Sequence, residues 1–332
     1  MKSFIRVART PRIELPFEVV ERKGVGHPDT LADAIAENMS RRYSQYVREK
    51  FGGYAHHWFD KVVLIGSEAS LTYGAGRLER PFHAILTGKC VLQVGKEVIP
   101  VDSLFAQAAA AVLTQHLYGF DPADHLRCEV RVTDGRGPGQ AASRYRPGDA
   151  SELVHVLGQG VSNDCNLCAG FAPLSVIEQM VMQTEQYLSD PTYRADYGSG
   201  TDVKVVGTRQ GDAYHLLVNL PFVADFVSSR DAYLDRVEQA RRRTQTLLES
   251  HFAGDITIVV NPEKQSGRSY LTATGSVLDT GDVGVVGRGN RINGLITPTR
   301  PMSIEASCGK NPLDHTGKLY GIAAHRAATA LG

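Results

Sequence analysis

Apolar residues that recur every three or four positions predict the first helix of the chain, over residues 28–51. The residues on this face are Leu31, Ile35, Met39, Tyr43, Tyr46 and Val47. Pro28 suits the first turn of a helix, where its missing N–H would have no partner, and Gly52-Gly53 ends the pattern. Further helices are predicted over 103–118, from the Ser175/Glu178 capping box to about 189, over about 228–251, and from about 317.

Short runs rich in Val, Ile and Leu predict strands between these helices. The predicted strands cover 61–66, 82–94, 127–133, 202–208, 213–220, 255–260 and 269–278. Residues 209–212 (RQGD) predict a hairpin turn, and the Gly-rich stretches 134–150 and 281–294 predict loops. Hairpins and long helices do not alternate strictly. This favours an α+β fold with helices over one face of largely antiparallel sheets.

Composition narrows the classes of protein that this chain can belong to. Lys plus Arg and Asp plus Glu are equal at 36 each, so no strong basic field exists to hold a nucleic-acid backbone. No run of about 18 apolar residues predicts a membrane span, and the N-terminus does not resemble a signal peptide. The five cysteines, Cys90, Cys128, Cys165, Cys168 and Cys308, are sparse and odd in number, which predicts a reducing compartment. We expect a cytoplasmic protein without nucleic-acid or membrane partners.

Residues 24–30 (GVGHPDT) open the first predicted helix and carry the first candidate chemistry. Glycines let the backbone approach a ligand, and a helix N-terminus offers free N–H groups to an anion. His27 can donate a hydrogen bond or carry a positive charge. Asp29 would repel a bare phosphate but suits a site where a divalent metal lies between the two. The alternative is a turn in which Asp29 only caps the helix.

Two later stretches combine glycine with basic residues. Residues 281–291 (GDVGVVGRGNR) place flexible backbone beside Arg288, and guanidinium pairs well with phosphate oxygens. Residues 309–312 (GKNP) carry Lys310. Neither stretch is a Walker loop, and each could equally be a solvated surface turn.

Taken together, these stretches resemble the S-adenosylmethionine synthetase family, and most closely its archaeal-type branch. The matching blocks are 18–39, 163–178, 201–207 and 281–320, and the resemblance runs in order from about residue 17 to 326. It implies methionine adenosyltransferase activity, with ATP and L-methionine as substrates and Mg²⁺ and a monovalent cation such as K⁺ as cofactors. It also implies a homodimer with active sites at the subunit interface.

The resemblance implies a role for each matched residue. His27, Lys204, Arg288 and Lys310 resemble the groups that hold and expel triphosphate, and Asp29 resembles the Mg²⁺ ligand. The residues implied to bind substrate are Glu68, Asp164, Asp282, Gly135 and Gly137. The two glycines belong to the Gly-rich loop linked to ATP.

The implied fold consists of three similar, intertwined α+β units of mixed or antiparallel sheet covered by helices, about a pseudo-threefold axis. Approximate boundaries are 1–150 for the unit with the Gly-His-Pro-Asp block, 151–252 for the second, and 253–332 for the unit with the later phosphate-binding blocks. Family members continue past the Gly-Lys-Asn-Pro block, so we expect strands of the third unit to be missing from this C-terminally short chain.

The residue types suit this reaction on chemical grounds as well. The nucleophile is a thioether sulfur without a proton to lose, so no Ser-His-Asp or Cys-His arrangement is required. The difficult event is departure of triphosphate, which needs cations, metal and hydrogen-bond donors around developing negative charge. The sulfonium product is cationic, so nearby acids would stabilise it.

Departures from the family pattern leave alternatives open. Residues 134–140 form a longer loop than the archaeal branch has, which motivates a paralogue that adenosylates another thioether. The short C-terminus motivates a non-catalytic, nucleotide-binding partner subunit. Cys165 and Cys168 form a C-x-x-C pair. The two residues are either small packed side chains near the substrate, or a metal-binding or redox-active pair.

Overall fold

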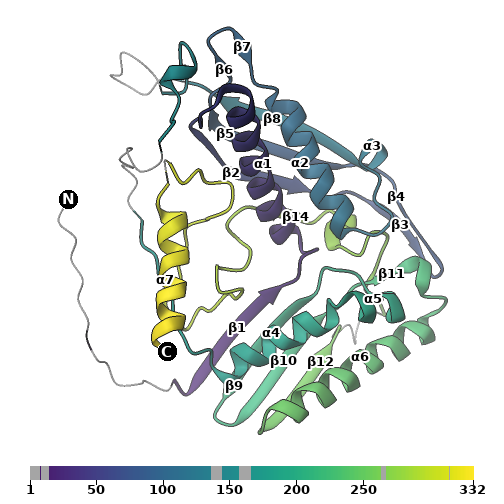
Figure 1. Cartoon of the computed structure of the whole chain (residues 1–332). Helices are drawn as coiled ribbons and strands as arrows, with labels where there is room; N and C mark the ends of the chain where they lie inside the picture. Colours follow the sequence, from purple (N-terminus) through teal and green to yellow (C-terminus); the bar gives the residue numbers. More distant parts are fainter. Residues whose placement is uncertain (1–7, 9–14, 136–143, 157–165, 263–266, 314) are drawn as a thin grey trace.

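Two four-stranded mixed sheets, each covered by helices, form the body of the chain (Figure 1). The computed structural model describes residue 8 and residues 15–135, 144–156, 166–262, 267–313 and 315–332. The α+β class predicted from the sequence is confirmed. None of the helices in these ranges is long and apolar enough to cross a membrane.

The first sheet has the strand order β14-β2-β5-β8. These strands are β14 (Val283–Val285), β2 (His57–Ile65), β5 (Phe82–Cys90) and β8 (Leu126–Thr133). Helices α1 (Pro28–Phe51) and α2 (Val101–His116) pack on each other and on this sheet (Figure 1). The predicted face of α1 lies in this core: Leu31, Ile35, Met39, Tyr43 and Val47 are inaccessible to solvent, and Tyr46 is partly buried.

The second sheet has the strand order β1-β9-β10-β12. Its strands are β1 (Phe17–Lys23), β9 (Lys204–Gln210), β10 (Ala213–Asn219) and β12 (Asp255–Val260). Helices α4 (Val176–Leu188) and α6 (Arg230–His251) cover it and enclose a second core. The β9–β10 hairpin forms at the predicted turn, and β1 adds to its open edge in antiparallel register.

The remaining elements lie outside the two four-stranded sheets and the four helices named above. They are β3 (Ala69–Thr72), β4 (Ala75–Leu78), β6 (Gln93–Val94), β7 (Glu97–Val98), α3 (Pro122–His125), η1 (Ala150–Glu152), α5 (Pro191–Tyr197), β11 (Phe222–Val223), η2 (Ala224–Phe226), β13 (Leu271–Thr272), η3 (Val277–Asp279) and α7 (Gly317–Leu331).

Four of the six strand pairs in the two four-stranded sheets are antiparallel, as the sequence predicts. Helices α2 and α6 act as crossovers that make β5–β8 and β10–β12 the parallel pairs. Two local predictions were wrong. The strand predicted over 269–278 is only two residues long. The side chain of Asp279 accepts hydrogen bonds from the N–H groups of Ala273 and Thr274, so these groups are not available to a strand partner. The Gly-rich stretch 281–294, predicted as a loop, contains strand β14.

The two layers meet where β1 turns into α1. Gly24 and Gly26 donate to the carbonyls of Val203 and Thr201, so the turn runs against the chain that enters β9. A Cβ on Gly26 would lie 2.0 Å from Thr201 Oγ1, and a Cβ on Gly284 would lie 2.0 Å from the Pro28 carbonyl oxygen. Glycine therefore permits β1, β9 and β14 to converge at the N-terminus of α1.

We expect Gly284→Ala to destabilise the protein by about 1–3 kcal/mol, because its methyl group would push β14 away from backbone that cannot give way. Urea denaturation of the variant and the wild type measures this difference. Gly148→Ala is the control, because its Cβ meets only the flexible Glu152 carboxylate, at 3.3 Å. Equal stability of all three proteins would contradict this account of the junction.

Candidate active site

His27 caps the N-terminus of α1 and is held in one tautomer. Its Nδ1 accepts a hydrogen bond from the N–H of Asp29 at 3.2 Å, so the neutral ring carries its proton on Nε2. Burial, followed by the charge of Lys23, lowers the pKa of His27 to about 3. The sequence left open whether His27 donates a hydrogen bond or carries a charge. In this structure it is a neutral donor at pH 7.

Three cations surround His27. Lys23, Lys204 and Arg288 each contribute to lowering its pKa, so all three lie within electrostatic reach of the ring. Lys23 and Lys204 are direct partners across the β1–β9 ladder, and both contact Glu21 Oε1, at 3.5 and 3.4 Å. Positive charge is therefore concentrated at one helix N-terminus, which itself favours anions.

Asp29 is the buried anion of this cluster. Oδ1 accepts the N–H of Val285 at 3.0 Å, and Oδ2 accepts the ammonium of Lys23 at 2.9 Å. Burial alone would raise the pKa of Asp29. The hydrogen bond from Val285 and the contacts with Lys23 outweigh it and lower the pKa, so the carboxylate is ionised at neutral pH.

Two further acids, Asp202 and Asp282, lie near these cations. Asp202, which the sequence analysis did not single out, is buried and accepts the N–H of Val277 at 2.8 Å. Burial, with the nearby charge of Asp282, raises the pKa of Asp202 to about 7, whereas Lys204 opposes the shift. Asp282 is exposed, so the predicted substrate-binding acid lies at the solvent side of the pair.

Asp29 begins a row of acids along one face of α1. Asp33, one turn further, accepts the N–H of Gly287 at 2.9 Å, and Glu37 accepts the N–H of Gly309 at 3.0 Å. Burial raises the pKa of Asp33 to about 6. The row holds three points of the segment from Val285 to Gly309 against a single helix. Its four-residue spacing is a signal in the sequence that the analysis did not use.

Lys310 lies apart from the other predicted cations. It follows Gly309, whose N–H donates to the side chain of Glu37. Glu37 lies about two turns beyond Asp29 on α1, a distance of about 12 Å along the helix axis. The ammonium of Lys310 is buried and contacts Glu305 Oε2 at 3.2 Å. His27, Asp29, Lys204 and Arg288 are thus brought together, and Lys310 lies beside a position about two turns further along the same helix.

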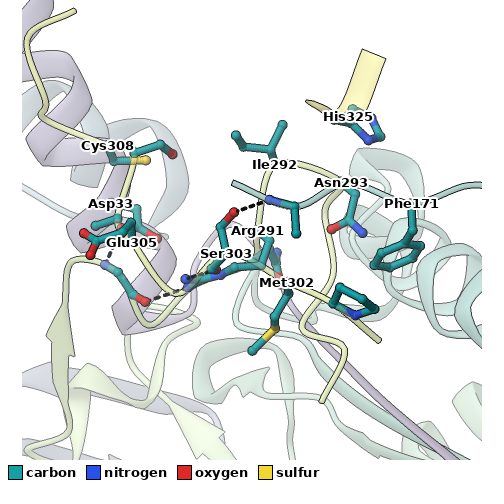
Figure 2. A pocket seen from close by; sticks show the side chains of 17 residues that line it. Asp33, Phe171, Arg291, Ile292, Asn293, Met302, Ser303, Glu305, Cys308 and His325 are labelled. Atoms are coloured by element: carbon teal, nitrogen blue, oxygen red, sulfur yellow. Dashed lines mark hydrogen bonds between the residues drawn. The ribbon is translucent and has the colours of Figure 1, made fainter. Parts of the chain in front are cut away.

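A pocket is lined by Asp33, by Gly287 and Asn290 on either side of Arg288, and by the segment that precedes Lys310 (Figure 2). Asp33, Glu305 and Cys308 lie on one side of it, and Phe171 and Asn293 on the other. Arg291 lines the pocket but donates to the carbonyls of Gly287 and Gly289, both at 2.6 Å. Arg291 therefore clamps the loop that carries Arg288.

The remaining predicted substrate residues lie elsewhere. Glu68 is exposed, 4.0 Å from Arg80, and its backbone pairs with Thr280, next to the segment of Asp282. Gly135 follows β8, at the edge of the first sheet opposite β14, and the structure does not bring it to the cluster. Gly137 and Asp164 lie outside the described residues.

The described residues contain no group of three or more His, Cys, Asp or Glu side chains that could hold a metal by itself. Cys168 Sγ donates to the Gly317 carbonyl at 3.4 Å, which favours packing for this half of the C-x-x-C pair. Cys165 lies outside the described residues. Burial raises the pKa of the Cys308 thiol to about 12, so it is not a thiolate at neutral pH.

Cations, a neutral imidazole donor and an ionised carboxylate at a helix N-terminus form an anion-binding site of the type that suits a polyphosphate. Comparison with known proteins agrees. The family model for S-adenosylmethionine synthetase (AdoMet synthetase) matches residues 4–331. The chain belongs to this family.

Relatives support the same assignment, and a solved structure resembles the fold. The S-adenosylmethionine synthase of Aeropyrum pernix is 39% identical over 97% of this chain and 79% of its own length. That of Pyrobaculum neutrophilum is 37% identical over 97% and 80%. The structure titled as an unusual S-adenosylmethionine synthetase from Campylobacter jejuni has a TM-score of 0.54 at 14% identity, covering 90% of this chain and 69% of its own. It supports the fold.

The raised pKa of Asp33 predicts how stability depends on pH. Its pKa of about 6 exceeds the ordinary value of 3.8, so the folded state loses stability as pH rises from 3.8 to about 6 and is not affected further above that. Asp33→Asn lacks this cost and can still accept the N–H of Gly287. Relative to wild type, its free energy of unfolding should therefore rise by about 1.4 kcal/mol between pH 5 and pH 7.5. Urea denaturation at both pH values measures this change, and a difference that does not vary with pH would contradict it.

Proposed function

We propose that this protein is a methionine adenosyltransferase, which converts ATP, L-methionine and water into S-adenosylmethionine, phosphate and diphosphate. The observation that carries the proposal is the convergence of Lys23, Lys204 and Arg288 on His27 and Asp29 in a chain of the S-adenosylmethionine synthetase family. Homologues that cover nearly the whole chain carry the name S-adenosylmethionine synthase.

The cluster suits the departure of triphosphate from the adenosyl carbon. As the carbon–oxygen bond breaks, negative charge grows on the leaving oxygen and spreads over the phosphates. Lys204 and Arg288 stabilise this charge, and the Nε2–H of His27 donates to it. The imidazole is neutral before the reaction, so it adds a directed donor without repelling the neighbouring cations.

The residues present fit a magnesium ion that shares its coordination with substrate. Magnesium is usually held by one or two carboxylates together with substrate phosphates, and Asp29 is a buried, ionised carboxylate beside the cations. When bound, the ion would neutralise charge on the phosphate chain. Asp29 would hold the ion, and Val285 keeps the carboxylate oriented.

Acidic residues are proposed to serve the cationic ends of the reaction. Asp202 lies within electrostatic reach of both Asp282 and Lys204. Asp282 suits the ammonium group of methionine or the adenosine hydroxyls. Glu68 and Asp164 are proposed for the same substrate by family resemblance. Lys310, beside a position about two turns further along α1, is proposed to bind the phosphate chain as well.

We also propose the finer features that the family implies. These are a monovalent cation such as K⁺, a homodimer with shared active sites, three intertwined units about a pseudo-threefold axis, and a cytoplasmic location. Gly135 follows β8, the edge strand opposite β14, away from the cluster of its own chain, which supports a contribution of Gly135 to the site of a second copy.

Purified protein with ATP, methionine, Mg²⁺ and K⁺ is expected to form S-adenosylmethionine, detected by mass spectrometry. Lys204→Ala and Arg288→Ala should each lower kcat by about 10²–10³-fold, because each removes a preorganised charge from the transition state. Lys96→Ala, at an exposed lysine, is the control and should retain activity.

A panel of other thioethers with ATP tests the paralogue hypothesis, and better turnover of one of them than of methionine would replace the proposed substrate. If the chain binds ATP but forms no product without a companion protein, it is a partner subunit and the proposal is wrong.

A further inference from the structure

Lys23 is the one buried cation of the cluster. Lys23 is the last residue of β1, and its side chain is only 9% exposed, compared with 33% for the side chain of Lys204. Its ammonium contacts Asp29 Oδ2 at 2.9 Å and the carbonyl oxygen of Arg288 at 2.8 Å. No sequence motif assigned it a role, although it lies in the block that matches the family.

A lysine at this position is costly. Like charges directly opposite each other in a sheet destabilise it, and Lys23 faces Lys204. A buried ammonium is tolerated only where anions and acceptors surround it. Here Asp29 and Glu21 supply the negative charge. A neutral donor would satisfy the carbonyl of Arg288 at lower cost, so the positive charge itself needs a reason.

The reason lies in what Lys23 does to Asp29. Each carboxylate oxygen already accepts one hydrogen bond, Oδ1 from Val285 and Oδ2 from Lys23. A magnesium ion would sit about 2.1 Å from one of these oxygens, and Lys23 would then repel it at short range. Phosphate oxygens remove this conflict, because they give Lys23 and the metal separate anionic partners.

We propose that Lys23 makes metal binding at Asp29 conditional on nucleotide. Without nucleotide, the ammonium of Lys23 occupies Asp29 and keeps divalent ions away. When a polyphosphate arrives, Lys23 turns to a phosphate oxygen beside Lys204 and Arg288 and releases the carboxylate to the metal. The inference rests on the proposed function only in taking the ligand to be a nucleotide polyphosphate.

The test is a titration of nucleotide-free protein with Mn²⁺, a paramagnetic substitute for Mg²⁺. The electron paramagnetic resonance signal of free Mn²⁺ measures how much of the ion is bound. Lys23→Met should bind Mn²⁺ at least about tenfold more tightly than wild type, because Asp29 loses its competing cation. Adding Asp29→Asn to Lys23→Met should abolish the gain. Lys96→Met, the same change at an exposed lysine, should bind as wild type does.

Unchanged or weaker Mn²⁺ binding by Lys23→Met would overturn the proposal and leave Lys23 a structural residue. If Lys23→Met does not fold, Lys23→Gln keeps a donor without charge and must show the same gain. Lys23→Arg keeps the charge and should remain at the wild-type affinity.

A second measurement follows the other half of the exchange. With Mg²⁺ present, Lys23→Met should bind the non-hydrolysable analogue β,γ-imido-ATP more weakly than wild type, because one phosphate contact is lost. Analogue binding at wild-type affinity would contradict the transfer of Lys23 to phosphate. Neither titration depends on turnover, so a failed activity assay and a failed inference are separable.

Discussion

The carboxylate of Asp29 is the contact on which the site depends. It joins the N-terminus of α1, strand β14 through Val285, and strand β1 through Lys23. Strand β1 and helix α1 are consecutive, whereas Val285 lies 256 residues after Asp29, and β1 and β14 belong to different sheets. Burial alone would favour the neutral acid, whereas the hydrogen bond from Val285 and the contacts with Lys23 favour the ionised form. The geometry of the cations and the charge of Asp29 therefore depend on each other.

The same helix face extends this arrangement beyond Asp29. Asp33 and Glu37 hold the backbone at Gly287 and Gly309, so a long segment without helix follows one edge of α1. Backbone N–H groups of such a segment need acceptors when they are buried, and regularly spaced carboxylates supply them. The loop that carries Arg288 is fixed from the other side by Arg291. The exposed guanidinium of Arg288 can then keep its position without being buried itself.

Much of the fold could be predicted from the sequence. The limits of α1 follow from Pro28, its apolar face and Gly52, and these signals agree with one another. The hairpin turn at residues 209–212 was also predicted correctly, from two strand-like runs on either side of it. The strand predicted over 269–278 was wrong because Asp279, a residue beyond it, binds the N–H groups of Ala273 and Thr274. Local strand propensity cannot report such a contact.

The site was predictable only where a residue lies in a matched motif. His27, Asp29, Lys204 and Arg288 meet, but Lys23 and Asp202 matter through pairing across strands and through burial, which a motif does not encode. The protonation state of His27 was equally out of reach, because it depends on burial and on Lys23, Lys204 and Arg288, which come from three segments. Those cations lower its pKa while no anion is bound. A polyphosphate among them would reverse this effect, so the ligand that needs the proton of His27 would also raise the affinity of the ring for one.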